Sequence, residues 1–123
     1  MAKTGVGGLR RIYNAFFYSL KGLRAGLKYE AAVRQELCLA VLMTALAAVI
    51  ADSLTLFLIL FILPWLTLAF ELANSAIEAV VDRIGDEYHE LSGRAKDLGS
   101  ACVFVLLCLD VIAYAAALWR YYS

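Results

Sequence analysis

Eighteen consecutive residues without a charge, Ser53 to Phe70, constrain the fold of this chain more than any other segment. Their length approaches the roughly 20 apolar residues that a helix needs to span a bilayer. The next residues continue the helical period and place polar groups within about a third of the circumference. These residues are Glu71, Asn74, Ser75, Glu78 and Asp82. Because carboxylates near hydrocarbon are costly, such residues usually face a bundle interior or an aqueous cleft. The segment therefore predicts a functional site where a membrane span emerges into water.

The rest of the chain predicts two further spans and one surface helix. Hydrophobic residues make up 63% of the 123 residues and the mean hydropathy is +0.77, which is too apolar for a soluble domain of this size. The expected spans are residues 30–51, 54–70 and 98–119, with the second helix continuing to about residue 85 and a polar loop over 86–94. We therefore expect an all-α membrane protein with a single domain, residues 1–123.

Residues 9–28 have the pattern of an amphipathic helix. Apolar residues recur at steps of three and four, and several are aromatic. Basic residues occupy the remaining positions, as in helices that lie in the plane of a membrane surface. The same apolar face would also suit packing against the rest of the protein, and the pattern leaves both interpretations open.

The distribution of basic residues predicts the orientation in the membrane. Seven of the eleven lie at or before Arg34, three follow the second span, and only Arg120 follows the third. The expected turn at Asp52 contains none. By the positive-inside rule we expect the amino terminus in the cytoplasm and the carboxy terminus on the outer side of the membrane.

Three helices are too few to hide every acid in the apolar segments from lipid. Glu71, Glu78 and Asp110 all need a polar or protein environment. We therefore expect a homo-oligomeric bundle, because small residues on the second helix permit close helix approach. These small residues are Ala73, Ala76 and Ala79. For Asp110 we expect a structural role, as an intersubunit contact or near the outer water.

The acids also suggest a cation or phosphate site. Glu71 and Glu78 lie two turns apart on one helix face, and Glu30 starts the first span at the same membrane level. A few carboxylates together with substrate phosphates are what Mg²⁺ prefers. Lys96 and Asp97 begin the third span on the same side. A purely structural network of interhelical hydrogen bonds is the alternative.

Other classes of chemistry find little support in the residues. His89 is the only histidine, and the three cysteines lack the spacing of a zinc site or a disulfide framework. No GxxxxGK[ST] phosphate loop occurs, and basic residues are too sparse for a nucleic-acid surface. The residues alone therefore indicate a small polytopic membrane protein with an acidic site at the membrane interface. An enzyme, a small transporter or channel, and a non-catalytic assembly protein all remain open.

Two long polar segments resemble one known family. ELANSAIEAVVDRIGDEYHELSGRAKDLGSA, from Glu71 to Ala101, and KGLRAGLKYEAAVRQE, from Lys21 to Glu36, are similar to the bacterial integral-membrane diacylglycerol kinases. The related undecaprenol kinases share the glutamate–asparagine–acid pattern, but the EYHELSGRAKD segment is closer to the diacylglycerol enzymes. The resemblance covers nearly the whole chain and keeps the order of three spans.

The resemblance implies phosphoryl transfer from MgATP to the free hydroxyl of diacylglycerol, giving phosphatidic acid. It also implies a homotrimer with active sites shared between subunits. Its expected location is the bacterial inner membrane, with the carboxy terminus in the periplasm. Glu71 matches the proposed catalytic base, and Glu30 and Glu78 match acids that bind the metal. Undecaprenol or another lipid alcohol is the alternative acceptor.

The resemblance further implies two sets of binding residues. The nucleotide would be bound by Arg11, Tyr18, Glu30, Asn74, Glu78, Glu87, Tyr88, His89, Lys96 and Asp97. The lipid substrate would be bound by Arg11, Arg24, Ala31, Ala32, Val33, Arg34, Gln35, Glu36, Glu71 and Ser100. Such a set fits the reaction, because phosphoryl transfer depends mainly on positioning and on neutralising charge.

Overall fold

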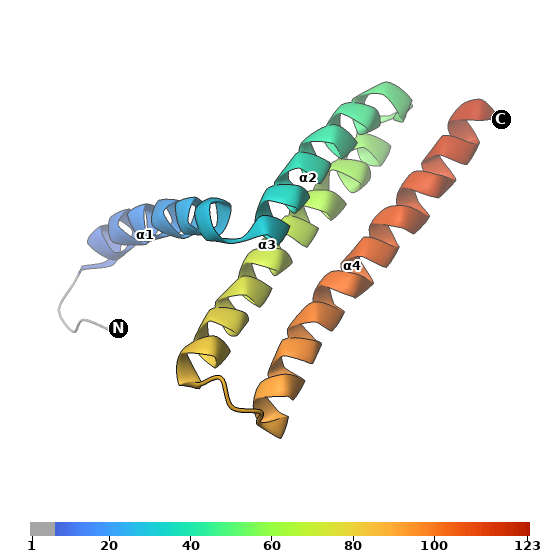
Figure 1. Ribbon diagram of the computed structural model, residues 1–123. Coiled ribbons are helices and arrows are strands. Elements are labelled where there is room, and N and C mark those ends of the chain that lie inside the picture. Colours follow the sequence, from blue (N-terminus) through green and yellow to red (C-terminus); the bar gives the residue numbers. More distant parts are fainter. Residues whose placement is uncertain (1–6) are drawn as a thin grey trace.

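The computed structural model describes residues 7–123, which form four helices joined by short connections (Figure 1). The helices are α1 (Gly8–Tyr29), α2 (Ala31–Ile50), α3 (Leu54–Ile84) and α4 (Glu90–Tyr122). Helices α2, α3 and α4 are each long and apolar enough to cross a membrane. The all-α fold with three spans and an amino-terminal helix is thus confirmed.

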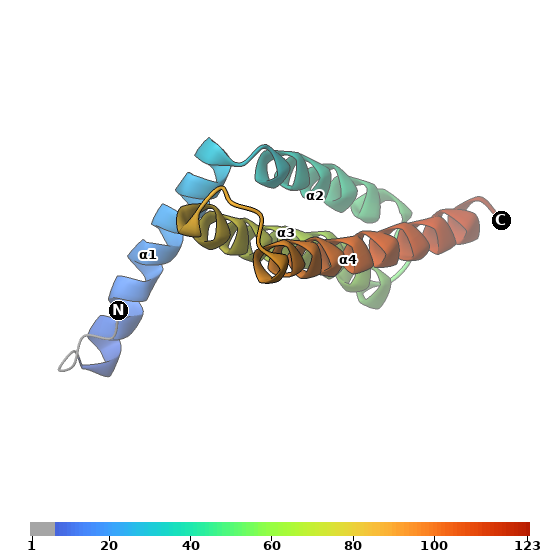
Figure 2. The same ribbon diagram turned by 60° about the horizontal axis from the view of Figure 1, so that its bottom comes forward.

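The three long helices lie side by side, and α1 crosses their direction (Figures 1 and 2). Helix α3 packs against both α2 and α4, whereas α2 and α4 have little contact with each other. The polar ends of α3 and α4 extend past the junction between α1 and α2 (Figure 1). This end of the bundle carries the polar face predicted from the sequence.

A single residue, Glu30, separates α1 from α2. Its backbone is extended, with φ −115° and ψ 111°, so the chain changes direction between two helices. Arg34 stabilises the break by donating to the carbonyl oxygens of Leu27 (2.8 Å) and Lys28 (3.2 Å), which lack partners within α1. Gly26 lets α1 approach α3 closely, since an added Cβ would lie 2.8 Å from Leu72 Cδ2.

The opposite end of the bundle is closed by the turn between α2 and α3. Ser53 caps α3, its hydroxyl oxygen accepting from the Leu56 N–H at 3.2 Å. Asp52 forms an ion pair with Arg120 of α4, with 2.8 Å between Oδ2 and Nη2. The tight turn expected at Asp52 and Ser53 is confirmed, and it also anchors the carboxy-terminal end of α4.

The core of the bundle contains a polar contact that compensates for a proline. Pro64 has no N–H, so the carbonyl of Leu60, four residues earlier, receives no helical hydrogen bond. Tyr114 of α4 donates its hydroxyl to that carbonyl and lies 3.0 Å from the carbonyl oxygen of Met43 in α2. Unpaired carbonyls are costly in a bilayer. Tyr114 therefore stabilises α3 at its weakest point and joins all three spans.

Two expectations from the sequence are corrected here. The polar loop predicted over 86–94 is shorter, because α4 begins at Glu90. The His89 side chain caps α4 by accepting from the Leu91 N–H at 3.1 Å, and Glu90 pairs with Arg94 across the first turn. Polar residues with a good cap thus form helix in water, where composition suggested a loop.

The second correction concerns Asp110, which was expected at a subunit contact or near the outer water. Asp110 is instead buried between α3 and α4 of the same chain, where Thr67 lies 2.8 Å from its Oδ2. Its polar contact is therefore internal to the subunit.

Candidate active site

The polar face of α3 runs from the bundle interior into water. Glu71, Asn74 and Ser75 are buried, Glu78 is half-buried, and Asp82 is exposed. The helical period that placed these residues on one face is thus confirmed. Asn74 donates its amide to Glu78 Oε1 at 3.2 Å, which orients both side chains. Glu71 therefore lies in the most desolvated part of this face, with an amide and a second carboxylate along the same helix.

Helix α4 holds this face in place through a glycine that the sequence reasoning missed. A Cβ at Gly99 would overlap Asn74 Oδ1, so only glycine allows this approach. Asn74 Oδ1 is buried and has no hydrogen-bond partner among residues 7–123. A glycine within a helix is an unspecific signal, and only the packing of α4 on α3 reveals its role.

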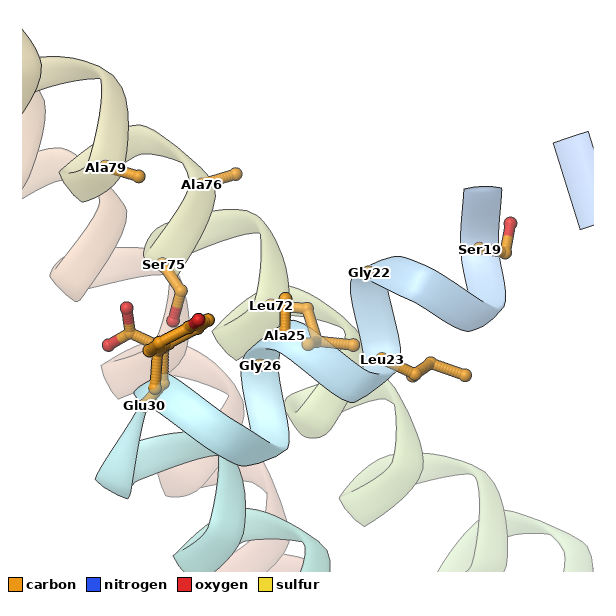
Figure 3. A pocket seen from close by; sticks show the side chains of 11 residues that line it. Ser19, Gly22, Leu23, Ala25, Gly26, Glu30, Leu72, Ser75, Ala76 and Ala79 are labelled. Carbon is orange, nitrogen blue, oxygen red and sulfur yellow. The ribbon is translucent and has the colours of Figure 1, made fainter. Parts of the chain in front are cut away.

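A groove of about 590 Å³ lies between α1 and α3, next to the polar face (Figure 3). Its walls are mostly apolar and contain small residues from both helices. Glu30 and Ser75 supply polar groups where α1 meets α2, as Figure 3 shows. An apolar groove with a carboxylate at its end is suited to an amphiphilic molecule.

A smaller groove of about 270 Å³ lies at the water end, around the connection between α3 and α4. It contains Glu87, Tyr88, His89 and Lys96, all of which the resemblance assigned to the nucleotide. Lys96 Nζ lies 2.6 Å from Asp82 Oδ1 at an exposed position. The structure thus brings these four residues together, with Lys96 as the cation among them. They lie at the end of the bundle that the sequence predicts to face the cytoplasm.

Other predicted nucleotide residues lie apart from this groove. Arg11 and Tyr18 are exposed on the first half of α1, which extends away from the bundle (Figure 2). Asp97 is exposed on α4, one residue beyond Lys96. Within one chain, the first half of α1 does not join the polar face of α3.

The predicted lipid residues differ in their surroundings. Val33 is buried in the core, Arg34 caps α1, and Glu36 is half-buried. The remaining residues of that set, apart from Glu71, are exposed: Arg11, Arg24, Ala31, Ala32, Gln35 and Ser100. Val33 and Arg34 therefore already have a structural role in the chain itself.

The carboxylates of Glu30, Glu71 and Glu78 do not form a closed cage. The charges of Glu78 and Glu30 both act on Glu71. Within residues 7–123, however, no three acidic, histidine or cysteine side chains are close enough to enclose a metal ion. The donor set is oxygen only and incomplete, which fits Mg²⁺ completed by phosphate oxygens and not a structural metal.

The comparison with known proteins places this geometry in a family. The model of the family described as prokaryotic diacylglycerol kinase matches residues 17–118. The chain is a member of the prokaryotic diacylglycerol kinase family. The diacylglycerol kinase of Escherichia coli strain K12 is 47% identical over 117 residues, which cover 94% of this chain and 95% of that protein.

Other prokaryotic diacylglycerol kinases are similarly related. The diacylglycerol kinase of Haemophilus influenzae is 44% identical, covering 91% of this chain and 95% of its own length. That of Pseudomonas aeruginosa is 43% identical and covers 93% of both chains. The family resemblance noted in the two polar segments is thus confirmed along almost the entire chain.

Proposed function

We propose that the protein is an ATP-dependent lipid kinase that phosphorylates the free hydroxyl of diacylglycerol to give phosphatidic acid. Family membership supports this activity. The observation that carries it is the polar face of α3, where Glu71 is buried at the membrane edge and Glu78 emerges toward water. A hydroxyl held in the membrane and a nucleotide from the cytosol can both reach this level.

Glu71 acts as the general base in this proposal. Its carboxylate accepts the proton of the lipid hydroxyl while the hydroxyl oxygen forms a bond to the γ-phosphorus of ATP. The bond between that phosphorus and the bridging oxygen to the β-phosphate breaks, and ADP leaves with the electron pair. Asn74, bonded to Glu78, keeps the face ordered for this geometry. A positioned base of this kind contributes roughly 10²- to 10⁴-fold to the rate.

Glu30 and Glu78 would hold Mg²⁺ together with the nucleotide phosphates. The ion would neutralise negative charge on the phosphates. Lys96 would add a positive charge in the groove at the water end, close to Glu87, Tyr88 and His89. The apolar groove between α1 and α3 and the start of α2 would accommodate the lipid side.

A homotrimer with shared active sites accounts for the residues that one chain leaves apart. Arg11 and Tyr18 are exposed on the first half of α1, which extends away from the bundle, so a neighbouring subunit would receive them. We expect two inactive variants, Glu71→Gln and Arg11→Ala, to regain partial activity when mixed as subunits after dissociation. An inactive mixture would show that each chain contains an independent site. Light scattering in detergent tests the number of subunits, and a particle other than a trimer would refute the trimer.

The assay of the reaction is direct. Purified protein in mixed micelles should transfer label from ATP to diacylglycerol only with Mg²⁺ present, and chelation should abolish the transfer. Undecaprenol, offered in parallel, should be a poorer acceptor. In sealed membrane vesicles, external ATP should be used only when the cytoplasmic face is outward, in keeping with a cytoplasmic amino terminus. Absence of any lipid product would refute the proposal.

A further inference from the structure

Asp110 is a buried acid for which the proposed reaction has no use. Only 3% of its surface is exposed, and Thr67, its partner from α3, is 0% exposed. Thr67 Oγ1 lies 2.8 Å from Asp110 Oδ2. Intramembrane acids are expensive and usually functional, so this pair calls for an explanation beyond helix packing.

The number of hydrogen atoms available for the contacts of Thr67 and Asp110 indicates the protonation state of Asp110. Thr67 Oγ1 also lies 2.9 Å from the carbonyl oxygen of Leu63, one turn earlier in α3. A hydroxyl has one hydrogen to donate, and neither neighbouring oxygen brings another if Asp110 is ionised. Two full hydrogen bonds, instead of one hydrogen shared between two acceptors, form when Asp110 carries the second hydrogen and donates it to Thr67.

The surroundings of Asp110 agree with a neutral acid. No salt bridge in the described chain, residues 7–123, includes Asp110, and its Oδ1 has no hydrogen-bond partner there. The titratable groups near it are Glu36 of α2 and Tyr114 of α4, and the Tyr114 hydroxyl donates to the Leu60 carbonyl and not to Asp110. A buried carboxylate with no cation nearby would be strongly destabilising.

The pair lies next to the proposed base. Thr67 precedes Glu71 by one turn on the same face of α3, and Asn74 follows by one turn. Helix α4 therefore holds α3 on both sides of Glu71, through Asp110 with Thr67 and through Gly99 with Asn74. Rotation of α3 about its axis, which would redirect Glu71, is opposed at both points.

We propose that Asp110 is a positioning residue of the kinase, a neutral acid whose hydroxyl fixes Thr67 and thereby the direction of Glu71. This inference rests on the proposed function, since it assigns Asp110 a role in that reaction. Two purely apolar helices would pack hydrophobic side chains against each other at this level. In this chain, the hydrogen bond between Thr67 of α3 and Asp110 of α4 takes their place.

The test compares three variants in the lipid kinase assay. Asp110→Leu and Thr67→Val each remove the hydrogen bond and should lower kcat roughly 10- to 100-fold, with KM for ATP nearly unchanged. Asp110→Asn keeps a neutral donor and should retain most of the activity. The double variant Asp110→Leu with Thr67→Val should be no worse than the poorer single variant, because both remove one interaction.

A control separates positioning from general stability. Tyr114→Phe also removes a buried hydrogen bond of α4, but its partner Leu60 lies about three turns before Glu71 in α3, whereas Thr67 lies one turn before it. Tyr114→Phe should therefore lower thermal stability without lowering kcat. Equal loss of kcat in Tyr114→Phe, or normal kcat in Asp110→Leu, would overturn the positioning role. So would an Asp110→Asn variant as impaired as Asp110→Leu.

Infrared spectroscopy tests the neutral acid independently of turnover. At neutral pH, the difference between the parent protein and Asp110→Asn should contain the carbonyl band of a protonated carboxylic acid. A carboxylate band in its place would overturn the inference even if the kinase is active. If the parent protein makes no phosphatidic acid, the proposed function fails, and with it the positioning role, while the band still reports the state of Asp110.

Discussion

Replacing Glu71 by glutamine should nearly abolish lipid phosphorylation without unfolding the protein. Glutamine has almost the same shape but cannot accept the proton of the lipid hydroxyl. Removing a general base typically lowers the rate by roughly 10²- to 10⁴-fold, and we expect kcat to fall within that range. Because Glu71 is buried at 7% exposure, loss of its charge should not lower thermal stability. Initial rates with labelled ATP and diacylglycerol measure the effect.

Glu90→Gln is the matched control for this substitution. Glu90 is exposed and pairs only with Arg94 one turn along α4, so its loss should leave kcat unchanged. A Glu71→Gln protein that retains more than about a tenth of the parent kcat would exclude Glu71 as the base, given the usual contribution of such a group. A Glu71→Gln protein that fails to bind ATP would instead assign Glu71 to the nucleotide site.

Gly99→Ala should strongly reduce activity although Gly99 bears no reactive group. The new Cβ would overlap Asn74 Oδ1, and Asn74 must then move and weaken its hydrogen bond to Glu78. Displacing a site by about 1 Å can lower kcat roughly 10²-fold. Overpacking costs about 1–3 kcal/mol, against which the better helix propensity of alanine returns about 1 kcal/mol. We therefore expect a large loss in kcat and a small loss in thermal stability.

Gly8→Ala serves as the control for the glycine effect, since a Cβ there meets no atom within 4 Å. It should keep full activity. If Gly99→Ala were as active as Gly8→Ala, the close contact between α4 and Asn74 would have no part in the reaction.

Much of the fold is predictable from local patterns in the sequence. Long apolar runs, interrupted in α4 only by Asp110, predict the three spans, and the period of Glu71, Asn74 and Glu78 correctly predicts one face. The beginning of α4 at Glu90 is not predictable from composition, because a single capping side chain, His89, decides whether polar residues near water form helix or loop.

Contacts between helices are less predictable than the helices themselves. The resemblance identified Asn74 and the Glu87–His89 segment, and the structure joins the latter to Lys96. The sequence contains no signal that Gly99 faces Asn74 or that Asp110 meets Thr67, because both contacts depend on how α4 is rotated and shifted against α3. We propose that Arg11 acts in the site of a neighbouring subunit. The helical period of a single chain cannot predict such a role.

The bond from Tyr114 to the Leu60 carbonyl has a consequence for biogenesis. Pro64 leaves that carbonyl open until α4 arrives, so α3 enters the bilayer as an incomplete helix. The partner it needs, Tyr114, is 54 residues further along the chain and is synthesised later. We therefore expect α3 and α4 of a newly synthesised chain to pack together as soon as both are in the bilayer.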